Sequence, residues 1–151
     1  DGSGLVGADL YHTLTRQIDH IVDTWYPLGL ANGDPITTPA DRLTFPAGST
    51  VMGEAWIVSR GDFGFISCAY KLYFCAAEGT HEGSSPEAYQ IRSSQLMILS
   101  DQYSSSAGDT SGFQVRIRID DTAGILIEVM SETSTSELKW LAEVKLTEVN
   151  Y

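Results

Sequence analysis

The chain has 151 residues, a length typical of a single domain. It carries 9 Lys and Arg against 20 Asp and Glu, a net charge of −11. This charge argues against nucleic acid or an anionic membrane surface as the main partner, because both attract basic proteins. The hydrophobic fraction of 42% indicates a globular fold, and no apolar run approaches the roughly 20 residues of a membrane-spanning helix. Because the chain begins at Asp1 rather than Met, we expect it to be part of a longer protein.

Residues 1–48 are predicted to form a short N-terminal helix or shaft segment followed by a linker. Asp9 can cap a helix, and apolar residues then recur every three or four positions until Pro27 would end it. This apolar stripe consists of Leu10, Leu14, Ile18, Ile21 and Trp25. A helix of this length is marginal alone, so the stripe either packs on its own domain or lies where three copies meet. Residues 26–48 hold four of the five prolines, which is typical of a linker or an extended surface segment.

From residue 49 onward the pattern is typical of β-strands, and apolar residues alternate with a period of two at 65–76, 112–120 and 138–146. We predict strands at residues 50–60, 65–76, 89–99, 112–120, 125–130 and 138–149. In the strand at 112–120 the apolar residues face inward, and we expect the outward Arg116 and Arg118 to pair with acids such as Glu128. Six strands without helical periodicity between them predict an all-β domain over residues 49–151, an antiparallel, jelly-roll-like β-sandwich.

The residue types that carry chemistry are sparse. Cys68 and Cys75 lie seven residues apart on one predicted strand, so they point to opposite faces and are expected to be free thiols. There is no nucleophile elbow and no phosphate-binding loop. The acids Asp120 and Asp121 are expected to form a turn rather than a catalytic pair. We therefore predict a protein that is not an enzyme and has no cofactor and no metal site.

Residues 51–149 resemble the C-terminal β-domain of bacteriophage tail fibres. The resemblance is carried by VMGEAWIVSR at 51–60, AYKLYF at 69–74, the hairpin FQVRIRIDDTAGILIEVM at 113–130 and the final LKWLAEVKLTEV at 138–149. The last of these is the most specific part. In addition, DGSGLVGADL at residues 1–10 is similar to a string that repeats in tail-fibre shafts, although Val6-Gly7 and Tyr11-His12 depart from it.

The resemblance implies a homotrimeric distal domain, carried on the virion and assembled in the host cytoplasm, that attaches to a glycan or protein on the host surface. Its other partner is the rest of the tail, and neither nucleic acid nor membrane insertion is expected. Three copies around an axis would bury the apolar stripe defined above. Two alternatives stay open: a tailspike-like polysaccharide depolymerase or esterase, and a purely structural trimerisation cap.

Receptor contacts are expected mainly in the polar loops at residues 78–87 and 100–111, because sheet-end loops carry the binding function of many β scaffolds. Tyr103 is the best candidate, since its ring can stack on a sugar beside hydrogen-bonding neighbours. The other candidates are Asp101, His81 and Tyr26. Trp25 is a further aromatic candidate, whereas Trp56 and Trp140 are expected in the core or at a subunit interface.

Overall fold

The computed structural model describes residues 6–19, 24–29, 43, 48–62, 67–79, 88–102, 113–120, 124–130 and 137–150. Within these residues the fold is all-β and contains no helix. The strands are β1 (Val6–Asp19), β2 (Tyr26–Pro27), β3 (Ser49–Gly61), β4 (Ser67–Gly79), β5 (Ala88–Gln102), β6 (Gln114–Asp120), β7 (Gly124–Met130) and β8 (Glu137–Asn150).

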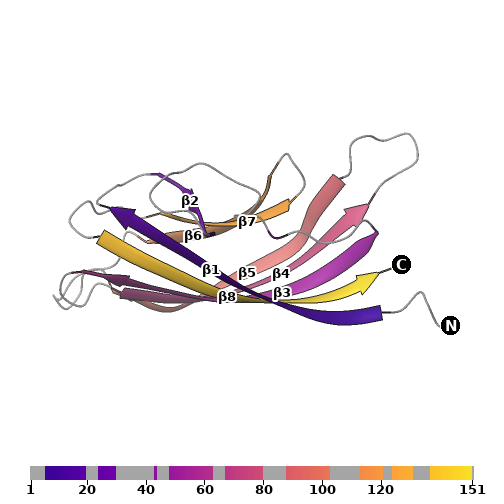
Figure 1. The fold of residues 1–151 in the computed structure, drawn as a ribbon, viewed down its shortest axis with the longest axis horizontal. Helices are drawn as coiled ribbons and strands as arrows, with labels where there is room; N and C mark the ends of the chain where they lie inside the picture. The colour runs from indigo at the N-terminus through magenta and orange to yellow at the C-terminus, as the bar shows by residue number, and fades with distance from the viewer. Residues whose placement is uncertain are drawn as a thin grey trace.

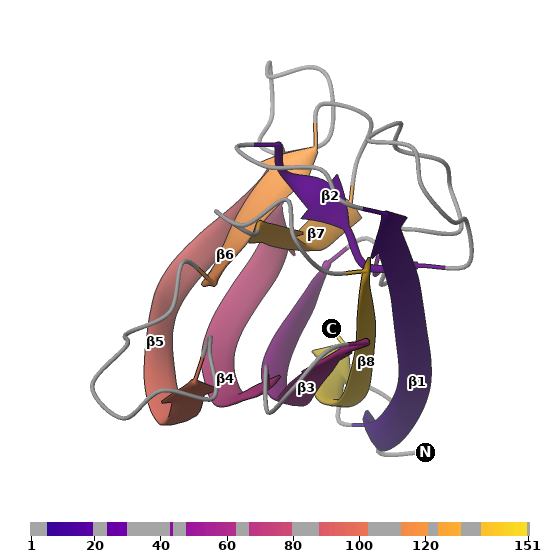
Figure 2. The ribbon, with the colours of Figure 1, turned by 90° about the vertical axis from the view of Figure 1, so that its left-hand side faces the viewer.

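The strands form two antiparallel sheets that pack as a sandwich (Figures 1 and 2). The larger sheet has the order β1-β8-β3-β4-β5, and the smaller sheet has the order β2-β7-β6. Figure 2 shows the smaller sheet lying across one face of the larger, curved sheet, with β5 at the edge opposite β1. The prediction of an all-β, antiparallel, two-layer domain is therefore confirmed.

The predicted N-terminal helix is wrong over the described residues, because residues 6–19 form strand β1. This strand pairs with β8 along its whole length, from Val6 opposite Asn150 to Asp19 opposite Glu137 (Figure 1). The physical reason lies in the spacing of Leu10, Leu14 and Ile18, since a step of four residues fits both a helical stripe and alternate positions of a strand. Residues on both sides of position 48 thus belong to one sheet.

The core lies between the inner faces of the two sheets. The alternation predicted for the central and last strands is confirmed, since every second side chain of β3, β4 and β8 is buried. Trp140 is 2% exposed and meets the edge of the Phe113 ring at 5.6 Å between centroids, so of the two predicted places, core or subunit interface, it occupies the core of the single chain. Cys68 is buried, Cys75 is partly exposed, and both are free thiols as predicted.

The segment around β2 ties the two sheets together beside β1. Gly29 exchanges backbone hydrogen bonds of 2.9 and 3.0 Å with Thr15 of β1, while the Leu28 amide donates to the Ile127 carbonyl of β7. The buried Arg16 donates from Nε to the Pro27 carbonyl at 2.7 Å. Backbone groups of residues 27–29 therefore form hydrogen bonds with strands of both sheets. These bonds make β1 part of the fold of the single chain.

This arrangement changes the setting of the apolar stripe. Leu14 and Ile18 are buried in the core of one chain, at 5% and 1% exposure. Leu10 pairs through its backbone with Leu146, and Ile21 lies outside the described residues. Trp25 is partly exposed and lies under the Arg116 guanidinium, 4.1 Å from its ring centroid. A role of these residues in contacts between copies stays a prediction.

The predicted hairpin and its charge pairing are confirmed in the smaller sheet. β6 pairs with β7 from Gln114 opposite Met130 to Asp120 opposite Gly124. The Nε atoms of Arg116 and Arg118 both donate to Oε1 of Glu128, at 2.8 and 2.7 Å. Glu128 is 3% exposed, so two charge-assisted bonds offset the cost of burying its carboxylate.

Candidate functional site

The larger sheet turns one face away from the smaller sheet, and we call this the outer face. It consists of the alternate side chains of β1, β8, β3, β4 and β5 that do not enter the core. Large apolar and aromatic side chains are exposed on it: Tyr11, Met52, Trp56, Val58, Met97, Leu141 and Val149. Such a concentration of apolar surface on one sheet face is typical of a binding surface rather than of a face that only meets water.

Strand register arranges the centre of this face in two neighbouring rows. In one row, Tyr11 lies opposite Lys145, Lys145 opposite Glu54, and Glu54 opposite Tyr73. In the next row, the order across the same four strands is Thr13, Glu143, Trp56 and Lys71. Directly opposed residues in antiparallel strands have neighbouring side chains. Each row therefore joins one acid and one base to aromatic residues, two in the first row and one in the second.

Lys71 connects the side chains at the centre of the two rows. Its Nζ lies 2.9 Å from Oε1 of Glu54, 4.0 Å from the ring centroid of Trp56 and 4.9 Å from that of Tyr73. Hydrogen bonds with the side chains of Tyr73 and Glu54 raise the pKa of the Lys71 ammonium above its ordinary value of 10.5. The Lys71 side chain is only 16% exposed. The charge is thus held in place, and it restrains the ring of Trp56.

A groove of about 430 Å³ runs over β8 between Tyr11 of β1 and Trp56 of β3. We call it the Tyr11–Trp56 groove. Tyr11 is 71% exposed and Trp56 is 49% exposed, so part of each ring system is open to a ligand, and Nζ of Lys145 lies 5.9 Å from the centroid of the Tyr11 ring. The remaining lining residues are His12, Thr13, Glu54, Glu143, Val144 and Lys145. The groove therefore combines two aromatic walls with carboxylates, a hydroxyl and an ammonium group.

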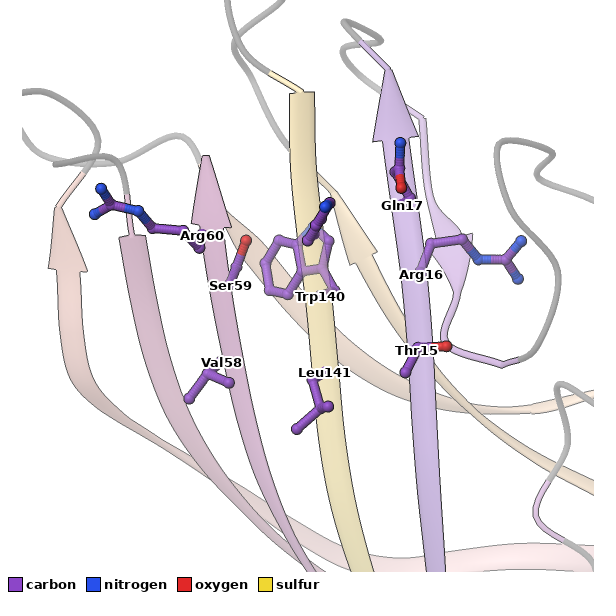
Figure 3. A pocket seen from close by; sticks show the side chains of 9 residues that line it. Thr15, Arg16, Gln17, Val58, Ser59, Arg60, Trp140 and Leu141 are labelled. Carbon is purple, nitrogen blue, oxygen red and sulfur yellow. The ribbon is translucent and has the colours of Figure 1, made fainter. Parts of the chain in front are cut away.

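A second depression of about 580 Å³ lies further along the same three strands (Figure 3). Thr15, Leu141 and Val58 come from β1, β8 and β3, and they are neighbours across the sheet. Gln17, Lys139 and Arg60 form the next row. Arg16, Ser59 and Trp140 complete the lining. The two depressions therefore lie over neighbouring stretches of β1, β8 and β3.

Of the residues predicted as receptor contacts, the structure describes Tyr26 and Asp101, and neither lines these two depressions. Tyr26 is in β2 of the smaller sheet and is 1% exposed, so it does not offer a stacking surface in the single chain. Asp101 belongs to β5, where it pairs with Cys68, and not to a loop. Tyr103 and His81 lie outside the described residues.

Sequence reasoning missed the outer face as a candidate site. Trp56 was expected in the core or at an interface, and the structure excludes the core for the single chain. The signal was present in the alternation of residues 50–60, where Trp56 shares its strand face with Glu54 and Arg60 and not with Ala55 and Ile57. What the sequence did not reveal was that Tyr11 lies on a strand beside it.

The described residues hold no group of three or more His, Cys, Asp or Glu side chains placed to bind a metal ion. Among the same residues there is no helix with the length and apolarity to cross a bilayer.

No protein-family model matches the chain, and no curated protein sequence shows significant similarity to it. Among solved structures, the crystal structure of the Acinetobacter baumannii phage AM24 tailspike protein is similar, with a TM-score of 0.44 and 8% sequence identity. The match covers 95% of this chain and 26% of the tailspike chain. The chain therefore spans about a quarter of the length of that protein. This degree of likeness is too low to show a shared fold.

Proposed function

We propose that this domain is the distal part of a bacteriophage tail fibre, which attaches the virion to a receptor on the host surface. The observation that carries the proposal is the outer face, where the exposed rings of Tyr11 and Trp56 and several charged side chains line one groove. A site of this composition suits recognition of a surface molecule, because it provides apolar contact area together with hydrogen-bonding groups that orient the ligand.

The sequence resemblance of residues 51–149 to tail-fibre tips supports the same proposal. Its quoted strings coincide with strands β3, β4, β6, β7 and β8. In this proposal the protein is a virion component, a homotrimer, and not an enzyme. Each single site then needs only weak affinity, because several linked sites on one particle raise the overall affinity by avidity.

Binding to cells and the mass of the particle test the proposal together. We expect a fluorescently labelled form of the 151-residue chain to bind whole cells of some strains in a panel of bacteria. Light scattering after size exclusion should give about three times 16.4 kDa. Absence of binding to any strain would overturn the attachment function, and a mass of one chain would overturn the trimer.

The enzymatic alternative makes a different prediction at the same surface. Glu54 and Glu143 both line the Tyr11–Trp56 groove, and a pair of carboxylates is what a glycosidase requires. A depolymerase would release new reducing ends from a bound polysaccharide, and Glu143→Gln would abolish that release. We expect no release from polysaccharides that the chain binds. A trimer that binds no cell at all would instead favour the structural cap.

A further inference from the structure

We infer that the Tyr11–Trp56 groove binds an uncharged pyranose unit of a host-surface glycan. The inference rests on the proposed attachment function and adds to it the position of the site and the chemical class of the ligand. It is carried by the two aromatic walls, by the polar groups between them and by the local balance of charge.

The walls suit a saturated ring whose faces carry C–H groups. Tyr11 and Trp56 come from strands on either side of β8 and from neighbouring rows, so their Cα positions are separated by roughly 10 Å across the sheet and roughly 7 Å along it. The C–H groups on the faces of a pyranose carry a small positive charge, while the face of an aromatic ring is negative. Stacking also removes apolar surface of both partners from water.

The ring of Trp56 is positioned before any ligand arrives. The Lys71 ammonium lies 4.0 Å from its centroid, and Glu54 holds that ammonium at 2.9 Å. Lys71 is on β4, and the groove runs along β8 on the other side of β3. One side of the Trp56 ring is therefore occupied by Lys71, while the groove side stays open. A ring restrained in this way loses less conformational freedom on binding.

The groups between the walls match sugar hydroxyls. The carboxylates of Glu54 and Glu143 accept hydrogen bonds, and a carboxylate can take two from neighbouring hydroxyls. Thr13 adds a hydroxyl that can donate or accept, and Lys145 adds a donor. A pyranose presents hydroxyls around its rim and C–H groups on its faces, so both kinds of group find partners in the groove.

Charge decides against an acidic sugar. Around the groove, Glu54 and Glu143 are balanced by Lys71 and Lys145, although the whole chain carries −11. A uronic acid or a phosphate in the groove would lie beside two carboxylates and would approach a strongly negative protein. An uncharged hexose or N-acetylhexosamine is repelled neither by the two carboxylates nor by the net charge of the chain.

Binding of the intact 151-residue chain to an oligosaccharide array tests this inference. The array should carry neutral hexose and N-acetylhexosamine oligosaccharides, with uronic-acid oligosaccharides as the charged comparison. We expect binding to neutral members only, and a loss of about tenfold or more in affinity for Trp56→Ala and for Tyr11→Ala. Met52→Ala is the matched control, because Met52 is 65% exposed on the same face but does not line the groove. It should bind like the parent chain.

Each other outcome is informative. Binding only to uronic-acid members, no binding to any neutral member, or an equal loss in Met52→Ala would overturn the inference. If Trp56→Ala left glycan binding intact but lowered the mass of the particle, the face would be a contact between copies instead. Binding to whole cells tests the attachment function separately from the sugar site in the groove. Unchanged cell binding by both wall variants would reject the groove and leave the attachment function standing.

Discussion

At Gly53, the absence of a side chain makes room for an aromatic ring. Gly53 lies on the inner face of β3 directly opposite Phe74 of β4, and a Cβ at this position would lie 2.0 Å from Cζ of Phe74. Phe74 is 2% exposed, so its ring belongs to the packed core. The glycine is therefore required by packing, and it allows the ring to cover the backbone of the neighbouring strand.

We expect Gly53→Ala to lower the free energy of unfolding by about 1–3 kcal/mol, the usual cost of overpacking a core. Urea denaturation followed by circular dichroism measures the change. The double variant Gly53→Ala/Phe74→Leu should recover part of the loss, because the smaller side chain vacates the clash. A neutral effect of the single variant would mean that the ring does not pack on Gly53.

We expect the contribution of Lys71 to the stability of the fold to depend on pH. Hydrogen bonds with Tyr73 and Glu54 raise its pKa in the folded chain above 10.5. When folding raises the pKa of a basic group, its charged form stabilises the folded chain. This contribution is complete at pH values below the pKa of the group in the unfolded chain, and it is lost as the pH rises through the pKa in the folded chain. The stability advantage of the parent chain over Lys71→Met should thus persist at pH 9 and shrink only above the ordinary pKa. Thermal melts of both proteins over this range provide the measurement, and an advantage that disappears by pH 8 would contradict the assignment.

At the scale of elements, β1 shows how far sequence patterns determine this fold. Strands β4 and β8 alternate clearly, and their inward and outward residues could be assigned from sequence, whereas nearly all of β7 is buried and residues 92–99 of β5 are all exposed. In residues 10–18, the step of four between Leu10, Leu14 and Ile18 satisfies helix and strand alike. Only the long-range pairing with β8 decides between the two structures, because local sequence contains no information about a partner 120 residues away.

The candidate site could not be predicted from the sequence, because it also depends on which strands pair. Trp56 and Glu54 were visible as neighbours on one strand face, but Tyr11 joins them only through β8. The aromatic residues that looked most exposed in sequence were near turns and loops, and Tyr26 proved to be buried because β2 packs against β7. Residues that come together across a sheet are set by register, which a single sequence does not give.

The position of β1 in the sheet leads to a prediction that separates core from interface. Ile18 is 1% exposed in the single chain, so Ile18→Ala should cost about 2–5 kcal/mol of stability while leaving the particle mass unchanged. Thr13→Ala, on the exposed face of the same strand, should change stability by less than about 0.5 kcal/mol. Denaturant unfolding and light scattering give the two readouts. If Ile18→Ala lowered the particle mass but left the free energy of unfolding unchanged, Ile18 would lie in a contact between copies and not in the core.

In the whole molecule, the edge of the larger sheet at β5 is unusual. Residues 92–99 are all exposed, and Leu96, Met97, Ile98 and Leu99 follow one another there. Leu96 and Ile98 lie opposite Leu72 and Tyr70, which are buried. Their side chains therefore point to the inner side of the sheet, at a place that the smaller sheet leaves open. A long apolar edge strand of this kind promotes association unless another surface covers it.

We expect the copies of the proposed trimer to cover this edge, because three chains of −11 need apolar contact to outweigh their mutual repulsion. Ile98 is 60% exposed in the single chain, so Ile98→Glu should leave the circular dichroism spectrum unchanged and shift the particle toward the mass of one chain. Gln95→Glu adds the same charge to the same strand without removing an apolar contact, and it should keep the parent mass. If both variants dissociate, general charge repulsion is responsible. If Ile98→Glu keeps the mass of three chains, the copies meet elsewhere.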